Sequence, residues 1–148
     1  MTCRNGFTRL VTTGYETMCI LVSQGHDDVF SWEAAESHCE HLGGRLVVLD
    51  SHAKIQMLKQ YLLANFHKEG HGAPHFWIGA KDFAGRDVFN WVSNQHAAIT
   101  VTDWAPDQPS NTGAHHKVED CVEVKADTDY QWDDKECNHE QAYICEQV

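Results

Sequence analysis

Basic side chains are scarce in this sequence, and their scarcity narrows the range of partners. The 148 residues include 11 Lys and Arg against 22 Asp and Glu, so the formal charge is −11 with the 11 histidines neutral. Nucleic acids and anionic lipid surfaces attract proteins mainly through Lys and Arg. We therefore expect no nucleic-acid partner and no affinity for anionic membranes. The acidic excess is compatible either with binding of a hard cation or with a merely solubilising surface.

Long apolar runs, internal repeats and low-complexity tracts are also missing. No run approaches the ~18 residues that a membrane-spanning helix needs, so we expect no membrane insertion. The segment 1–3 lacks the apolar core of a secretion signal, and the leader of an exported protein would lie outside this sequence. Hydrophobic residues make up 42% and charged residues 22%, as in ordinary folded proteins. This length suits one core, which predicts a single domain over residues 1–148.

The cysteines form no CxxC pair and no Cys/His cluster with zinc-finger spacing. They stand at positions 3, 19, 39, 121, 137 and 145. An even, dispersed set favours disulfides and hence a secreted, extracellular protein, with reduced core cysteines in the cytosol as the alternative. Six cysteines allow 15 pairings, and their number does not choose among them.

Helical periodicity is confined to the first half of the chain. We expect one helix over residues 31–42, capped by Ser31 and ended by Gly43 and Gly44, and a second from Ser51 to about Gly70 and Gly72. The inward-facing residues are predicted to be Trp32, Ala35, Cys39 and Leu42 in the first helix and Ile55, Leu58, Leu62 and Phe66 in the second.

Strand-like runs dominate the second half. One short buried run at 45–49 lies between the helices, and later runs cover 76–79, 88–92, 121–124 and 142–145. Between Trp104 and Cys121 the sequence is too polar and too interrupted for either periodicity, so we expect a long functional loop. With helices first and strands later, the pattern predicts a segregated α+β fold.

Eight short motifs cover nearly the whole chain. They are Trp32-x-x-Ala35-x-x-x-Cys39, Gly43-Gly44-Arg45-Leu46, Phe76-Trp77-Ile78-Gly79, Trp91, Trp104-Ala105-Pro106, Glu119-Asp120-Cys121-Val122, Trp132-Asp133-Asp134 with Cys137, and Tyr143-Ile144-Cys145-Glu146. In this order they resemble a C-type lectin-like domain of the long, secreted invertebrate style. The resemblance implies the C-type lectin fold, with two helices, short antiparallel strands and a long ligand-binding loop. It also implies the disulfides Cys3–Cys19, Cys39–Cys145 and Cys121–Cys137.

The resemblance further implies a calcium site. In calcium-dependent members the ligands are the outer residues of a Glu-Pro-Asn or Gln-Pro-Asp triplet with a cis proline, a Glu two places before a cysteine, and a Trp-Asn-Asp segment. The matching positions here are Gln108, Ser110, Glu119, Asp133 and Asp134. Ser110 departs from the pattern with a shorter, uncharged hydroxyl, and Asp133 departs with a carboxylate in place of an amide. Three carboxylates remain, and calcium accepts such mixed oxygen ligands.

In the family, two neighbouring sugar hydroxyls complete the shell of the metal. By resemblance, one hydroxyl would meet Gln108 and Asp133, and the other Ser110 and Glu119. The predicted function is calcium-dependent binding of glycans with vicinal hydroxyls, with a role on microbial surfaces in innate immunity and with the choice between mannose and galactose open. The alternative is a calcium-independent protein–protein interaction module of the same fold, in which these residues belong to a decayed site.

Two other candidate metal sites are predicted to hold no ion. An auxiliary calcium position of the family matches Asp82, Arg86, Glu119 and Asp120, and we predict no ion there because Arg86 stands where a carboxylate is needed. Glycines and a proline interrupt the segment that carries His67, His71 and His75, which predicts solvated loop histidines and not a zinc site.

Three further expectations concern pH, catalysis and multivalent binding. The His115–His116 pair lies on the long loop, where protonation at about pH 6.5 would oppose calcium binding. No nucleophile elbow, HExxH motif or phosphate-binding loop occurs, so we predict that the protein is not an enzyme. No heptad stalk is present, so multivalent binding would need an oligomer contact or a partner chain.

Overall fold

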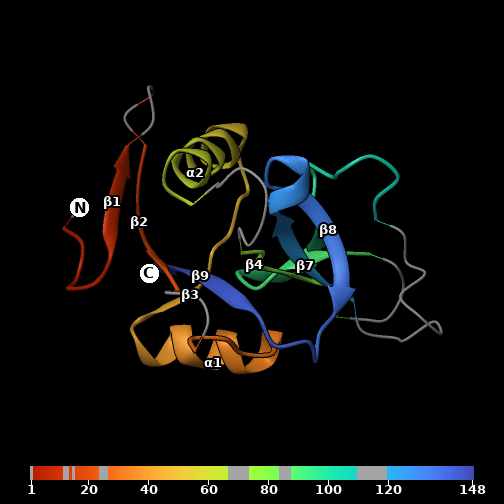
Figure 1. The fold of residues 1–148 in the computed structure, drawn as a ribbon, viewed down its shortest axis with the longest axis horizontal. Helices are drawn as coiled ribbons and strands as arrows, with labels where there is room; N and C mark the ends of the chain where they lie inside the picture. The colour runs from red at the N-terminus through yellow and green to blue at the C-terminus, as the bar shows by residue number, and fades with distance from the viewer. Residues whose placement is uncertain are drawn as a thin grey trace.

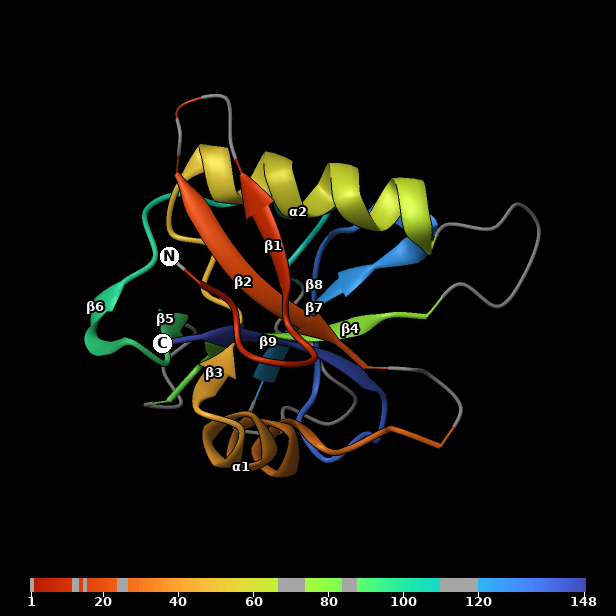
Figure 2. The same cartoon turned by 90° about the vertical axis from the view of Figure 1, so that its left-hand side faces the viewer.

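The strands form one mixed sheet, with the two helices on opposite sides of its centre (Figure 1, Figure 2). A computed structural model describes residues 2–11, 14, 16–23, 27–66, 74–83, 88–109 and 120–148, apart from the side chain of residue 96. The elements in chain order are β1 (Thr8–Val11), β2 (Thr17–Val22), α1 (Trp32–His41), β3 (Gly44–Leu46), α2 (His52–Asn65), β4 (Phe76–Lys81), β5 (Asn90–Trp91), β6 (Asn94–Ala98), β7 (Asp120–Lys125), a short 3-10 helix (Ala126–Thr128), β8 (Gln131–Glu136) and β9 (Ala142–Gln147).

Both helices begin at the predicted caps. The Ser31 hydroxyl accepts a hydrogen bond from Ala34 N at 3.3 Å, and the Ser51 hydroxyl accepts one from Lys54 N at 3.2 Å. Buried side chains follow the predicted stripes, namely Trp32, Ala35 and Cys39 in α1 and Ile55, Leu58 and Leu62 in α2. The second helix ends earlier than predicted, because Phe66 leaves the helical conformation and turns toward the core, where its ring lies 5.8 Å from that of Phe76.

Strand β9 joins the two parts of the sheet. It pairs antiparallel with β2 and β3 near its end, and parallel with β4 near its start. Beyond β4 the sheet continues to β7 and β8 on one path and to β5 and β6 on another. The parallel pairing places β9, which ends the described chain, beside β4 in the middle of the sheet.

The order of elements corrects the expectation that the first helix precedes every strand. A hairpin of β1 and β2 comes before both helices, with Thr8 opposite Ile20. It belongs to the fold because β2 pairs with β9 and because the Cys3–Cys19 bridge ties its beginning down. The fold class remains α+β.

Strand boundaries also differ from the sequence expectation between the helices. Pairing stops at Leu46, although Val47, Val48 and Leu49 are buried as predicted. Val47 N still donates to Ile144 O at 2.9 Å, but at the next residue the Val48 N–H donates to the Glu146 side chain at 2.8 Å instead of to a neighbouring strand. Strands β6 and β8 were not predicted, since their polar sequences show little apolar alternation.

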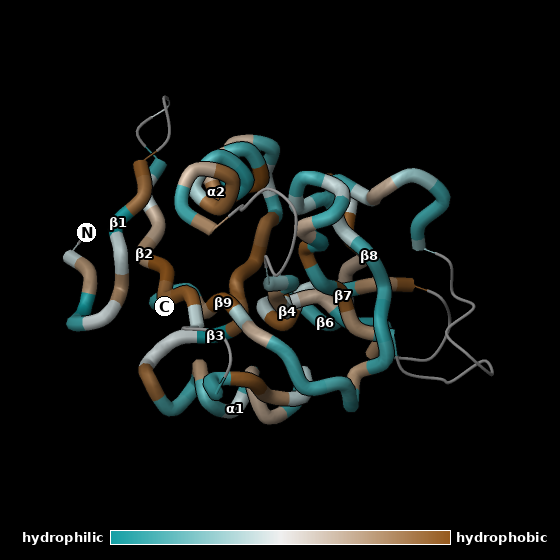
Figure 3. Tube along the Cα trace, viewed as in Figure 1, coloured by the Kyte–Doolittle hydropathy of each residue, from teal (hydrophilic) through white to brown (hydrophobic). Residues whose placement is uncertain are grey.

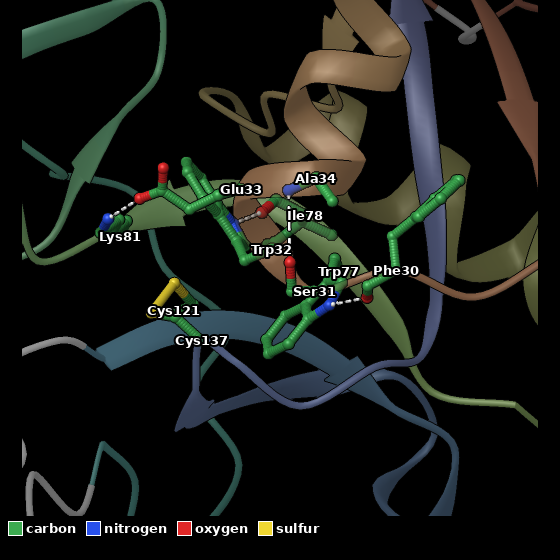
Figure 4. Close-up of a disulfide and its surroundings, with 10 residues drawn as sticks. All are labelled: Phe30, Ser31, Trp32, Glu33, Ala34, Trp77, Ile78, Lys81, Cys121 and Cys137. Carbon is green, nitrogen blue, oxygen red and sulfur yellow. Dashed lines mark hydrogen bonds and ion pairs between the residues drawn. A yellow bond between two sulfur atoms is a disulfide. The ribbon is translucent and has the colours of Figure 1, made fainter.

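Two apolar clusters make up the core, in the regions that Figure 3 shows as hydrophobic between the helices and the strands. One lies under α2, and the other lies under α1 and contains the Cys39–Cys145 and Cys121–Cys137 disulfides. Figure 4 shows the Cys121–Cys137 bridge near the start of α1, where Trp32 Nε1 donates to Ile78 O at 2.8 Å. All three implied disulfides are present, with Cα–Cα distances of 5.5, 5.5 and 5.1 Å.

None of the helices in the described part of the chain combines the length and the apolar character of a membrane span.

Candidate functional site

The segment from Asp103 to Pro109 is fastened to the beginning of β8. Trp132 N donates to Asp103 O at 2.8 Å, and Ala105 N donates to Trp132 O at 2.9 Å. The Trp132 side chain is fully buried, and its ring lies 5.6 Å from that of Trp104. Because Asp133 and Asp134 follow Trp132 directly, these bonds hold the loop beside both carboxylates.

Gln108 stands at the end of this fastened segment. Its N–H donates to Ala105 O at 3.0 Å, and its peptide bond to Pro109 is cis, as the resemblance implies. Its Oε1 atom is buried and has no hydrogen-bond partner among the residues that the structure describes. A buried amide oxygen without a partner costs free energy, so this atom is suited to receive a ligand.

Asp133 lies in an unfavourable electrostatic environment. It faces Glu123 directly across the β7–β8 ladder, and its side chain is 17% exposed. Burial, followed by the negative charges of Glu123 and Asp134, raises the pKa of Asp133 to about 6, against the attraction of Lys125 Nζ at 3.9 Å. A bound cation would relieve this clustering of negative charge.

Glu123 contributes much of the negative charge around Asp133, and sequence reasoning missed it. Its side chain is 2% exposed and accepts a hydrogen bond from Gln141 Nε2 at 3.0 Å, while His75 Nδ1 and Lys135 Nζ lie at 3.7 and 3.8 Å. Burial alone would raise the pKa of Glu123, but these three neighbours outweigh it and lower the pKa. The available signal was one carboxylate between the apolar residues of β7.

His75 corrects one expectation from the sequence. It was predicted to be a solvated loop histidine, but its side chain is only 25% exposed and lies against Glu123. The histidine is partly buried because β4, which follows it, brings it beside β7.

The structure places three of the five predicted ligands, Gln108, Asp133 and Asp134. Ser110 and Glu119 lie outside the described residues, as do Arg86, His67, His71, His115 and His116. Within the described ranges, no group of three or more His, Cys, Asp or Glu side chains is gathered to hold a metal. The orphaned Gln108 oxygen and the crowded carboxylate of Asp133 nevertheless fit a hard divalent cation.

At the auxiliary position, Asp82 and Asp120 are both buried, and Asp82 N donates to Asp120 O at 2.9 Å. The absence of an ion there remains a prediction, because it depends on Arg86.

Comparison with known proteins identifies the family of this domain. The family model described as the lectin C-type domain covers residues 29–147. The chain belongs to the C-type lectin domain family. Salivary C-type lectin 2 of Aedes albopictus is 31% identical over 121 residues, which are 81% of this lectin domain and 79% of the relative. The family is one of carbohydrate-binding domains and not of enzymes, in agreement with the sequence prediction.

Two further comparisons define the extent of this likeness. Hepatic lectin of Gallus gallus is 31% identical over 116 residues, which cover 78% of this chain but only 49%, about half, of the relative. The structure of the mouse scavenger receptor C-type lectin carbohydrate-recognition domain superposes with a TM-score of 0.77 at 22% identity, over 99% of this chain and 98% of the other. The latter likeness shows the fold.

Proposed function

We propose that this C-type lectin domain binds glycans with vicinal hydroxyls through a calcium ion. The proposed ligands are Gln108, Ser110, Glu119, Asp133 and Asp134. When bound, calcium supplies a Lewis-acidic centre for sugar hydroxyls, while the side chains around it accept from and donate to the same hydroxyls. The structural neighbour described above is named as a carbohydrate-recognition domain, which supports the sugar part of the proposal.

One observation carries the proposal, namely the buried Oε1 atom of Gln108, which has no hydrogen-bond partner in the described part of the chain and lies on a loop bonded to the start of β8. A glutamine in a decayed loop is free to turn its amide toward water. Here the oxygen is instead kept out of water, on a segment bonded to the strand that carries two other expected ligands, Asp133 and Asp134. Burial and neighbouring charges raise the pKa of Asp133 to about 6. Both features are costs that a bound cation would offset.

The test combines thermal unfolding with calorimetry. An ion that binds only the folded state must raise the melting temperature, by an amount that grows with its concentration. We expect calcium to raise it relative to chelator, and mannose or galactose to release heat only when calcium is present. No calcium response in a folded sample would refute the proposal and favour the calcium-independent protein-interaction module.

A substitution at Gln108 separates binding from folding. Gln108→Met removes an oxygen that makes no hydrogen bond to described residues, so the stability in chelator should be unchanged within about 0.5 kcal/mol or slightly increased. The calcium-induced rise in melting temperature should shrink or vanish. Gln60→Met, on the exposed face of α2, is the matched control and should retain the full calcium response.

We further propose that the protein is secreted and acts in innate recognition of microbial glycans. The three disulfides support an oxidising compartment. Chelator-sensitive binding to microbial cells is the measurement that tests the biological role.

A further inference from the structure

A cavity of about 250 Å³ opens beside Pro109, the residue that follows Gln108. Apolar side chains form most of its wall, and the principal ones are Val88, Phe89, Ile99, Trp104 and Pro109. No charged residue is among the described residues that line it. Its chemistry therefore differs from that of the acidic calcium site next to it.

Val88 gives this cavity an unusually exposed apolar rim. Among the large hydrophobic residues that the structure describes, only Val11, Val88 and Val148 are largely exposed, and Val88 is 44% exposed. A single exposed valine on a surface is ordinary. An exposed valine at the edge of an apolar cavity is different, because a ligand that fills the cavity would cover both together.

Ring contacts and chain connectivity link the cavity to the candidate calcium site. The Trp104 ring in its wall lies 5.2 Å from the Phe89 ring and 5.6 Å from the Trp132 ring, and Trp132 precedes Asp133. Pro109 belongs to the same fastened loop as Gln108. The wall of the cavity therefore begins one residue after the proposed ligand Gln108.

The volume limits what the cavity can hold. Sites for whole drug-sized ligands usually measure ~300 to 1,000 Å³, so a cavity of about 250 Å³ suits one part of a ligand. An additional sugar ring would bring hydroxyl groups to a wall with few polar partners, at a desolvation cost. A short hydrocarbon chain matches both the size and the chemistry.

We propose that this cavity is a second subsite, which accepts an alkyl or acyl substituent carried by the glycan at the calcium site. The preferred ligands are accordingly glycans with an apolar chain close to the bound sugar, such as acylated or lipid-linked sugars. This inference rests on the proposed function, because it assumes that the sugar is held beside Gln108.

The experiment is a calorimetric titration with methyl, butyl and hexyl mannosides and the corresponding galactosides, in calcium and in chelator. Complete burial of one methylene is worth about a three- to fourfold gain in affinity. Because the chain is only partly enclosed, we expect the hexyl glycoside to bind at least about tenfold more tightly than the methyl glycoside of the same sugar, and only in calcium.

Two variants locate the effect. Val88→Asn should reduce the ratio of hexyl to methyl affinity several-fold, whereas Val11→Asn is the matched control, since Val11 is similarly exposed at 51% on β1. Ala98→Trp places a large side chain at the cavity wall and should abolish the gain from the longer chain. The ratio is measured within each variant, so a general loss of active protein does not alter it.

The outcomes separate this inference from the proposed function. If methyl glycosides bind in calcium and longer chains add nothing, the subsite is refuted and the lectin function stands. If no glycoside binds in calcium, both proposals fail. Equal hexyl affinity in chelator would show an independent apolar site, and dissociation of a dimer by Val88→Asn would show that a second copy covers the cavity. Either result overturns the inference.

Discussion

Replacement of Asp133 by Asn should raise the free energy of unfolding in chelator, and calcium should narrow or reverse that gain. The pKa of this carboxyl rises from the ordinary 3.8 to about 6, mainly because of burial and then because of Glu123. The folded state therefore keeps a proton between about pH 4 and pH 6 that the unfolded state has already released. Unfolding releases that proton, so stability falls as pH rises through this window and is flat above it.

The size of the effect follows from the size of the shift. A rise of about two units in the pKa, at about 1.36 kcal/mol per unit, corresponds to a loss of about 3 kcal/mol in the free energy of unfolding. This is an upper value, because the side chain is 17% exposed. In chelator at pH 7, Asp133→Asn should therefore be more stable than the parent by up to about 3 kcal/mol, and the difference should disappear near pH 4. In calcium, the same change should weaken ion binding and narrow or reverse the difference.

The assay is urea unfolding followed by tryptophan fluorescence at several pH values between 4 and 7, in chelator and in calcium. Asp127→Asn is the control, because it removes one negative charge from a side chain that is 73% exposed. If the stabilities of Asp133→Asn and the parent keep a constant difference from pH 4 to pH 7 in chelator, the electrostatic argument is wrong. If calcium stabilises both equally, Asp133 is not a ligand.

Three further predictions concern the stability of the fold around the site. Removal of the Cys39–Cys145 bridge, which spans 106 residues, should lower the free energy of unfolding in urea by about 5 kcal/mol, and removal of the Cys3–Cys19 bridge, which spans 16, by about 3 kcal/mol. Equal losses, or a larger loss for the shorter loop, would contradict the argument from loop length. Glu146→Gln should lower the free energy of unfolding by about 3 kcal/mol, because its carboxylate is 6% exposed and lies 3.1 Å from Arg45 Nε and 3.3 Å from Lys54 Nζ. The control Asp50→Asn removes an exposed ion pair of the same lysine and should lower it by less than about 1 kcal/mol. Gly79→Ala should lower stability by about 2 kcal/mol or more in the same assay, since the new Cβ would lie 2.6 Å from Leu46 O and 3.0 Å from Val47 O; a variant as stable as the parent would show that this backbone contact yields easily.

Local chemistry was enough to predict the helices and their buried faces. Ser31 and Ser51 are side-chain caps that act within three residues, and the stripe from Trp32 to Cys39 follows from helical geometry alone. The sequence did not predict β8, because the polar run from Gln131 to Glu136 becomes a strand only by pairing along its length with β7. Its strand character comes from its neighbour and is not visible in its own pattern.

For the site, the sequence by itself determined the fold family, the disulfide pairs and the candidate ligands, because these depend on residue types that occur in a recognisable order. Only the tertiary structure decided that Gln108 Oε1 is buried without a partner among the described residues, that Glu123 faces Asp133, and that an apolar cavity adjoins Pro109. Burial, cross-strand field and cavity shape arise between segments far apart in the chain, and no pattern within one segment encodes them.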